Sequence, residues 1–211
     1  MTTMADAIRP AFARPGAGTD AQVRAGAFAY DLILVVAGSA LIAASAQVWF
    51  SLPFSPVPIT GQTFGVLFVA SLLGRSRGAA AVLLYLAEGA AGLPVFSEMK
   101  AGVPVLLGPT GGYLAGFVPG AWICGALAER GLDRRIGGTI LSMLLGNVAI
   151  FALGLPWLAR YVGTDHALAL GFWPFLPGDV VKIGLAAALL PLGWRLLAGR
   201  GRGRAGGSGG R

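Results

Sequence analysis

The sequence is poor in charge. Asp, Glu, Lys and Arg make up 12% of its 211 residues, whereas hydrophobic residues make up 55%. A soluble domain carries about 25% charged residues, roughly twice this fraction. This number of charges is too small to cover a water-facing surface. The composition therefore excludes a soluble globular protein and predicts an integral membrane protein. The 34 glycines agree, because glycine is commoner in membrane helices than in soluble ones.

Cysteine and histidine are almost absent, with one residue of each, Cys124 and His166. A single cysteine cannot form an internal disulfide. A structural zinc site needs several such ligands, and a Cys–His nucleophile pair needs the two side chains close together. The composition therefore argues against all three, and we expect no metal and no cofactor.

A nucleotide-binding loop is also missing. No GxxxxGK[ST] motif occurs, and neither Lys100 nor Lys182, the two lysines of the chain, is followed by Ser or Thr. That motif cradles nucleotide phosphates through its backbone, its lysine and its hydroxyl. If ATP drives transport by this protein, the ATPase is another polypeptide.

Apolar segments long enough for membrane helices recur along the chain. A membrane helix needs roughly 20 mainly apolar residues, and fewer when its neighbours shelter it. The sequence predicts an all-α bundle of six transmembrane helices, of which the second and third are short and rich in small residues. The six segments are 28–50, 60–73, 78–91, 112–128, 136–155 and 177–198.

Arginines gather at every second connection between these segments. They precede the first segment, separate the second from the third and the fourth from the fifth, and follow the sixth, while the other connections hold only Lys100 and Arg160. Since basic residues accumulate on the cytoplasmic side, both termini are expected in the cytoplasm of a multi-pass protein of the bacterial inner membrane.

The two ends of the chain are expected to lie outside the membrane domain, which spans residues 28–198. Residues 1–27 are predicted to form a flexible cytoplasmic segment, and residues 199–211 a disordered tail rich in Gly and Arg. Nucleic-acid binding is one interpretation of that basic tail. A cytoplasmic end close to anionic membrane lipid is favoured, and we expect no nucleic-acid partner.

The outside connections are apolar and rich in proline. Residues 51–64 and 92–113 contain three prolines each. Lipid-exposed irregular backbone is excluded from the hydrocarbon, so these loops are expected to fold over the bundle as a lid or pocket wall. A further group of aromatic residues is predicted to anchor the chain at the membrane interface. These are Trp157, Tyr161, Phe172, Trp173 and Phe175.

Asp179 and Lys182 stand three residues apart at the head of the sixth segment, where a helix places them on one face. Pro177 and an acid suit the first turn of a helix, so a helix cap with a snorkelling lysine is one interpretation. The other is a functional pair, because an ionisable residue inside a membrane segment is costly and needs a partner. Lys182 lies at the outside end, where positive-inside logic does not explain it.

Glu88, with Tyr85 three residues before it, and Lys100 are weaker candidates for function. The alternatives are an acid that reaches interfacial water and a solvated loop lysine. Ala40 and Ala44 have the four-residue spacing of small residues that lets helices approach closely. They fit either packing within the bundle or the docking of a partner, and self-association is possible.

Four motifs occur in an order that resembles the BioY family, the biotin-specific substrate-binding (S) components of energy-coupling factor transporters. They are "PVPITGQTF" at 56–64, "YLAEGAAGLPVF" at 85–96, "LLGPTGGYLAGF" at 106–117 and "PGDVVK" at 177–182. Each motif alone is weak, but four in order on a six-helix pattern are specific. The resemblance covers about residues 28–194.

The resemblance implies a six-helix bundle whose vitamin pocket opens outward beneath the first and third outside loops. It also implies a transmembrane T component and a pair of ATPases as partners, although some family members are proposed to work without them. The loaded S component is thought to topple in the membrane and release its vitamin inside. Ala40 and Ala44 match the small-residue pattern that docks S components on the T component.

The resemblance also assigns roles to the polar residues. Asp179 is expected to accept from the ureido N–H groups of biotin and Lys182 to donate to a ligand oxygen. Glu88 and Tyr85 are second candidates for ligand contact, and Lys100, near the expected exit of the carboxylate, is third.

Apolar contacts are expected as well, because small ligands usually sit in mostly apolar pockets. Trp49, Phe54, Phe64 and Phe96 are candidates to pack on the biotin rings. Glu98 departs from the mainly small residues expected in its loop, so the partner of the ligand carboxylate stays open.

Three rival functions remain. An S component for another small vitamin or cofactor precursor would have the same architecture. A membrane-embedded enzyme would need Asp179, Glu88 and His166 to converge as acid–base groups, and no nucleophile motif accompanies them. A passive channel would need a polar stripe along a helix, and none is evident.

Overall fold

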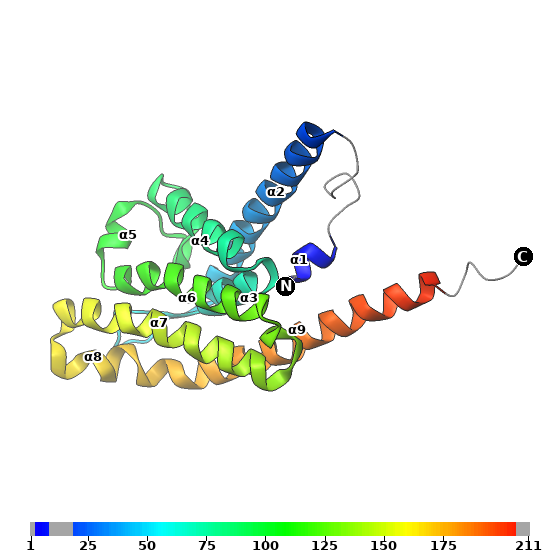
Figure 1. The fold of residues 1–211 in the computed structure, drawn as a ribbon. Helices are drawn as coiled ribbons and strands as arrows, with labels where there is room; N and C mark the ends of the chain where they lie inside the picture. The colour runs from blue at the N-terminus through cyan, green and yellow to red at the C-terminus, as the bar shows by residue number, and fades with distance from the viewer. Residues whose placement is uncertain (1–2, 9–18, 206–211) are drawn as a thin grey trace, which may run out of the picture.

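The computed structural model describes residues 3–8 and 19–205, with side chains up to residue 198. Helices make up most of it (Figure 1), so the all-α prediction is confirmed. The longer helices are α2 (Asp20–Ala46), α3 (Gln62–Leu73), α4 (Arg75–Ala90), α6 (Gly111–Glu129), α7 (Ile136–Val162) and α9 (Leu176–Ala205). The shorter ones are α1 (Met4–Ala7), α5 (Val103–Leu107) and α8 (Thr164–Gly171), with 3-10 turns η2 (Ser97–Met99), η3 (Leu132–Arg134) and η4 (Trp173–Phe175).

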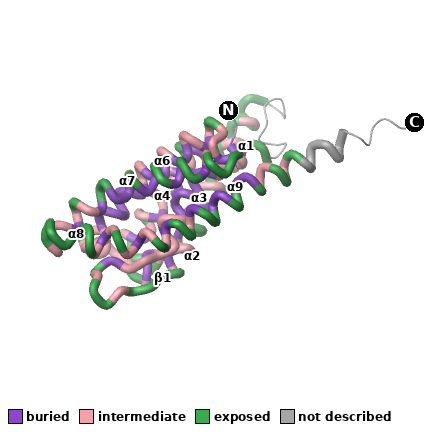
Figure 2. Tube along the Cα trace, turned by 90° about the horizontal axis from the view of Figure 1, so that it is seen from below, coloured by how far each residue is buried: buried purple, intermediate pink, exposed green. Residues whose placement is uncertain are grey.

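Several helices are suited to a membrane. In the part of the chain that the structure describes, four stretches are long and apolar enough to cross one: α2, α6, α7 and the run Thr164–Ala198 that contains α8 and α9. Large apolar side chains such as Ile33, Val148 and Val181 are exposed on these helices. Figure 2 shows exposed stretches in green along α7 and α9. The structure therefore has the apolar outer surface of a multi-pass membrane protein, while a count of six crossings stays a prediction.

The short helix α3 lies at the centre of the bundle, in contact with α2, α4, α6 and α9. Eight of its 12 residues are buried. The sequence of α3 is apolar or small from Phe64 to Leu73, so neighbours can surround it on several sides. This shelter explains how a helix too short to cross a bilayer alone keeps its place in the bundle.

The helix ends follow local signals. Thr19 and Gln22 form a capping box at the start of α2, and α7 ends at Gly163, whose φ of +83° suits glycine. The first predicted segment, 28–50, ends early as a helix. Trp49–Phe50 (β1) instead pairs antiparallel with Ile59–Thr60 (β2), which closes the loop between α2 and α3.

Helices α6 and α7 touch through their backbones. A Cβ atom on Gly116 would lie 2.8 Å from Cα of Ile150, and one on Gly120 would lie 3.0 Å from the carbonyl oxygen of Gly146. Both distances are at or below the limit for real contacts, so glycine is required there. This glycine seam makes α6 and α7 the most closely packed long helices of the fold.

The predicted flexible segment 1–27 contains ordered parts. The short helix α1 packs against the bundle, where Tyr30 donates to the carbonyl of Ala5 at 2.8 Å and Arg77 pairs with Asp6 at 2.7 Å. Burial raises the pKa of Asp6, but hydrogen bonds from Arg77 and Thr3 outweigh it and hold that pKa below its ordinary value.

Two boundaries of the predicted domains lie inside helices. Residues 20–27 form the first two turns of α2, and α9 continues to Ala205, inside the predicted tail. Residues 9–18 and 206–211 lie outside the described residues.

Candidate functional site

Asp179 and Lys182 meet as the sequence predicted. Both lie near the start of α9, with Nζ of Lys182 3.2 Å from Oδ1 of Asp179. Lys182 also donates to Oγ1 of Thr63, in the first turn of α3, at 2.9 Å. The side chains of Lys182 and Asp179 are only 15% and 8% exposed, so the ion pair is buried between two helices.

The hydrogen bonds of this cluster leave room for a ligand. A lysine ammonium has three N–H donors, and Lys182 has two acceptors in the described part of the chain, Asp179 and Thr63. An ionised carboxylate offers about four acceptor sites, of which Lys182 uses one on Asp179. Lys182 can therefore donate to one ligand atom and Asp179 can accept from others while the ion pair between them stays intact.

Tyr85 belongs to a second group of hydrogen-bonded residues, which includes Gln62, the residue before Thr63 in α3. Nε2 of Gln62 donates to the hydroxyl oxygen of Tyr85 at 2.6 Å, and the hydroxyl of Thr60 donates to Oε1 of Gln62 at 2.9 Å. Because Gln62 and Thr63 are neighbours, the start of α3 connects Tyr85 on α4 with Lys182 on α9.

Gln62 and Thr63 were not among the predicted site residues, although both lie inside the motif "PVPITGQTF". Two consecutive polar residues at the head of a helix that is otherwise apolar were the available signal.

The loops of residues 51–64 and 92–113 meet next to this region, and Thr60 and Gln62 belong both to the first of these loops and to the group of Tyr85. The two loops enclose a small cavity of about 40 Å³. A site for a small ligand has a volume of about 300–1,000 Å³, so the cavity is closed in this conformation. It is lined by Val57, Pro58, Thr60, Gln62, Phe96, Ser97, Val105, Thr110 and Leu114.

Phe96 fills the space beneath the loop of residues 92–102. Its ring is fully buried and meets Tyr85 edge-on at a centroid distance of 5.5 Å. It also lies against Gly89, where a Cβ atom would come within 2.1 Å of the ring. Phe96 has the largest side chain of the cavity lining, so its position limits the free space beneath the loop.

Gln47, the residue that follows α2, holds the same loop. Its Nε2 donates to the carbonyls of Val95 and Phe96 at 3.3 and 3.1 Å, and its Oε1 accepts from the backbone N–H of Met99 at 3.3 Å. Glu98 and Met99 have positive φ angles of 61° and 56°, which is uncommon for residues other than glycine. The Gln47 amide thus secures a strained turn above the cavity.

Glu88 and Lys100 lie apart from the cavity. Glu88 accepts a hydrogen bond of 2.5 Å from the hydroxyl of Ser39, at the contact between α4 and α2. Lys100 is exposed and pairs with Glu98 at 2.9 Å, and Glu98 also accepts from Ser51. The structure therefore pairs Asp179 with Lys182 and joins Tyr85 to Gln62, which lines the cavity, whereas Glu88 and Lys100 contact neither group.

The aromatic residues predicted to pack on a ligand or to anchor an interface lie in different environments. Phe64 stacks on Phe68 at 5.0 Å, whereas Trp49 and Phe54 are exposed at the first outside loop. The prediction that Phe175 anchors an interface is wrong, because it is buried against Tyr113.

Two other members of the predicted belt hold a loop. Nε1 of Trp157 donates to the carbonyl of Gly108 at 2.8 Å, and the hydroxyl of Tyr161 donates to the carbonyl of Leu107. Both side chains therefore fix the segment that follows α5. Phe172 packs edge-on against the neighbouring ring of Trp173.

Ala40 and Ala44 lie on the exposed side of α2. Packing within the described bundle therefore does not account for their spacing. They border exposed Val36 and Leu41, so this side of α2 is an apolar surface with small residues at its centre.

Known proteins resemble this chain over most of its length. "Biotin transporter BioY" of Thermotoga maritima is 43% identical over 159 residues, which cover 74% of this chain and 92% of the relative. The protein of the same name from Rhizobium etli is 38% identical over 182 residues, 81% of this chain and 97% of the relative.

A solved structure has the same fold. It is titled as the crystal structure of the S-component for biotin from an ECF-type ABC transporter, and it superposes with a TM-score of 0.70 at 25% identity, covering 82% of this chain and 93% of that one. The family model described as "BioY family" matches residues 17–199. The chain therefore belongs to the BioY family.

Proposed function

We propose that this protein is the biotin-binding S component of a vitamin uptake transporter. The observation that carries the proposal is the buried cluster of Asp179, Lys182 and Thr63 next to the Gln62–Tyr85 pair, of which Gln62 lines the cavity enclosed by the loops of residues 51–64 and 92–113. The relatives that bear the name of biotin transporters supply the ligand class.

The chemistry of biotin fits this cluster. Its ureido ring has two N–H donors and one carbonyl acceptor, its thioether ring is apolar, and its tail ends in a carboxylate. Asp179 is the acceptor that the ureido N–H groups need, and the free donor of Lys182 suits a ligand oxygen. Phe96 and Leu114, which line the cavity, provide apolar surface for the rings.

The proposed orientation places both termini in the cytoplasm, with six membrane crossings in the bacterial inner membrane. The arginine-rich connections follow the positive-inside pattern, and the loop-covered cavity then faces outward. A T component would dock on the exposed side of α2 at Ala40 and Ala44, and a separate pair of ATPases would supply energy.

Equilibrium binding of radiolabelled biotin to the purified protein in detergent tests the ligand. We expect one biotin per chain, with competition by unlabelled biotin and not by thiamine or riboflavin. Absence of binding by well-folded protein would overturn the proposal, and binding of a different vitamin in the same assay would replace biotin with that ligand.

Biotin methyl ester separates the two ends of the ligand. If Lys182 holds the carboxylate, the parent protein prefers the free acid and Lys182→Met abolishes that preference. If Lys182 holds the ureido carbonyl, both ligands weaken equally in Lys182→Met. The matched control is Lys100→Met, which removes an exposed lysine outside the cavity and is expected to leave both affinities unchanged.

A further inference from the structure

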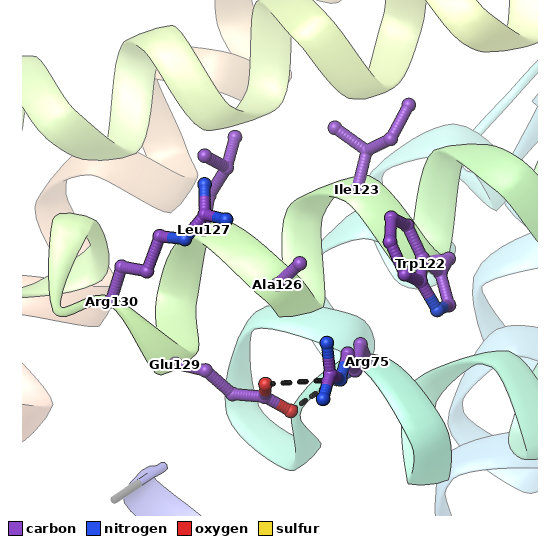
Figure 3. A pocket seen from close by; sticks show the side chains of 7 residues that line it. All are labelled: Arg75, Trp122, Ile123, Ala126, Leu127, Glu129 and Arg130. Carbon is purple, nitrogen blue, oxygen red and sulfur yellow. Dashed lines mark hydrogen bonds and ion pairs between the residues drawn. The ribbon is translucent and has the colours of Figure 1, made fainter. Parts of the chain in front are cut away.

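A second concave site lies at the other end of α6 from the cavity. It is an open groove of about 380 Å³ at the C-terminal end of α6 and the start of α4 (Figure 3). Its lining combines apolar and charged side chains: Trp122, Ile123, Ala126, Leu127, Glu129, Arg130 and Arg75. None of these residues takes part in the ligand cluster.

Two parallel stripes of α6 form the groove. Trp122, Ala126 and Glu129 follow one i, i+4, i+7 spacing, and Ile123, Leu127 and Arg130 follow the next. Residues at this spacing share a helix face. Each stripe is therefore apolar in its first two members and charged at its last, and the small side chain of Ala126 leaves the space between its larger neighbours.

The charges at this end do not cancel. Glu129 accepts from the backbone N–H of Arg75 at 3.0 Å and pairs with the Arg75 guanidinium at 3.4 Å, so it caps α4 and neutralises one arginine. Arg130 is exposed, and its guanidinium has no hydrogen bond or ion pair among the described residues. The charged end of the groove carries one net positive charge.

The apolar end has the character of a membrane interface. Trp122 is 50% exposed, and the Arg75 guanidinium lies 6.0 Å from its ring centroid. Tryptophan is enriched where a membrane meets water, and α6 is long and apolar enough to cross a membrane. The groove thus runs from a cationic end toward apolar surface, which is the polarity of a phospholipid.

We propose that this groove binds one anionic phospholipid, with the headgroup phosphodiester at Arg130 and Arg75 and the start of an acyl chain along Trp122 and Ala126. Basic sites beside membrane helices are known to bind anionic lipid headgroups. A soluble phosphodiester would satisfy the arginines but leave the apolar stripes without a partner, so the lipid is the favoured source of the phosphate.

Native mass spectrometry of the full chain, titrated with phosphatidylglycerol or phosphatidylcholine in detergent, tests the proposal. We expect one phosphatidylglycerol to be retained in preference to phosphatidylcholine, with at least a fivefold loss of retention in Arg130→Gln and in Ala126→Met, which fills the groove. The matched control is Arg160→Gln, since Arg160 stacks on Trp157 at 5.0 Å outside the groove. Thermal unfolding confirms that every variant is folded.

The other outcomes each overturn the proposal. Equal loss in Arg160→Gln would show a general effect of charge, and full retention in both Arg130→Gln and Ala126→Met would place the lipid elsewhere. Displacement of the lipid by soluble glycerophosphoglycerol at equal concentration would make the site one for a free phosphodiester.

Discussion

The two ends of the bundle use the same kind of ion pair in opposite settings. At the loop-covered end the side chains of Lys182 and Asp179 are 15% and 8% exposed, whereas at the other end those of Arg75 and Glu129 are 52% and 30% exposed. Exposed pairs contribute about 0–1 kcal/mol, but removing one partner of a buried pair costs about 3–5 kcal/mol. Burial therefore decides whether such a pair can control ligand binding or only fastens a helix end.

The largest loss of biotin affinity is expected when the buried pair is broken. Lys182→Met leaves the Asp179 carboxylate buried without its cation, so we expect biotin affinity to fall at least 100-fold, consistent with about 3 kcal/mol or more, together with a lower melting temperature. Isothermal titration and thermal unfolding in detergent measure the two effects.

The double variant Asp179→Asn/Lys182→Met sharpens this test, because it removes both charges. We expect it to recover most of the lost melting temperature but none of the lost affinity. Recovery of affinity as well would show that the pair only stabilises the fold.

A smaller effect is expected from Gly89→Ala. The added Cβ atom would lie 2.1 Å from the Phe96 ring, so the ring must move and the loop above the cavity loosens. Overpacking costs about 1–3 kcal/mol, and we expect biotin to dissociate roughly 10-fold faster in a chase experiment. Gly137→Ala, where nothing lies within 4 Å of the new atom, is the control, and equal off-rates in the two variants would contradict the interpretation.

Gln47→Leu should act in the same direction but more weakly. It removes the amide that binds the carbonyls of Val95 and Phe96 and the N–H of Met99. Met99 is exposed, so its N–H can be rehydrated, and we expect a loss of biotin affinity of about 3–10-fold, in line with roughly 1 kcal/mol. An unchanged dissociation rate would mean that the loop does not need this amide.

The smallest effect is expected at the exposed pair. Arg75→Gln should leave biotin affinity within about twofold of the parent and change stability by no more than about 1 kcal/mol. A large loss of biotin binding in this variant would break the contrast between the two ends and would point to coupling along α6.

The sequence was sufficient for features that depend on local pattern. Low charge and apolar runs predicted the helices, and the three-residue spacing of Asp179 and Lys182 predicted their contact. Thr63 was missed because it lies 119 residues from Lys182, and only packing of α3 against α9 brings them together. Phe175 was misplaced for the same reason, since its burial depends on Tyr113 from another helix.

Gly89 illustrates a further limit. It stands in "EGAAG" among small residues that look alike in the sequence, yet it alone of these glycines lies against the Phe96 ring. A glycine that lets an aromatic ring approach cannot be distinguished from one that ends a helix until the partner's position is known.

The glycine seam between α6 and α7 limits which motions this protein can make. At Gly116 and Gly120 the two backbones are already in contact, so turning α6 about its axis by one residue would drive a side chain into the α7 backbone. We therefore expect α6 and α7 to rotate and tilt as one unit. A conformational change that admits a ligand is then expected in the loops and in the helices on the α2 side, with α6 and α7 as the fixed reference.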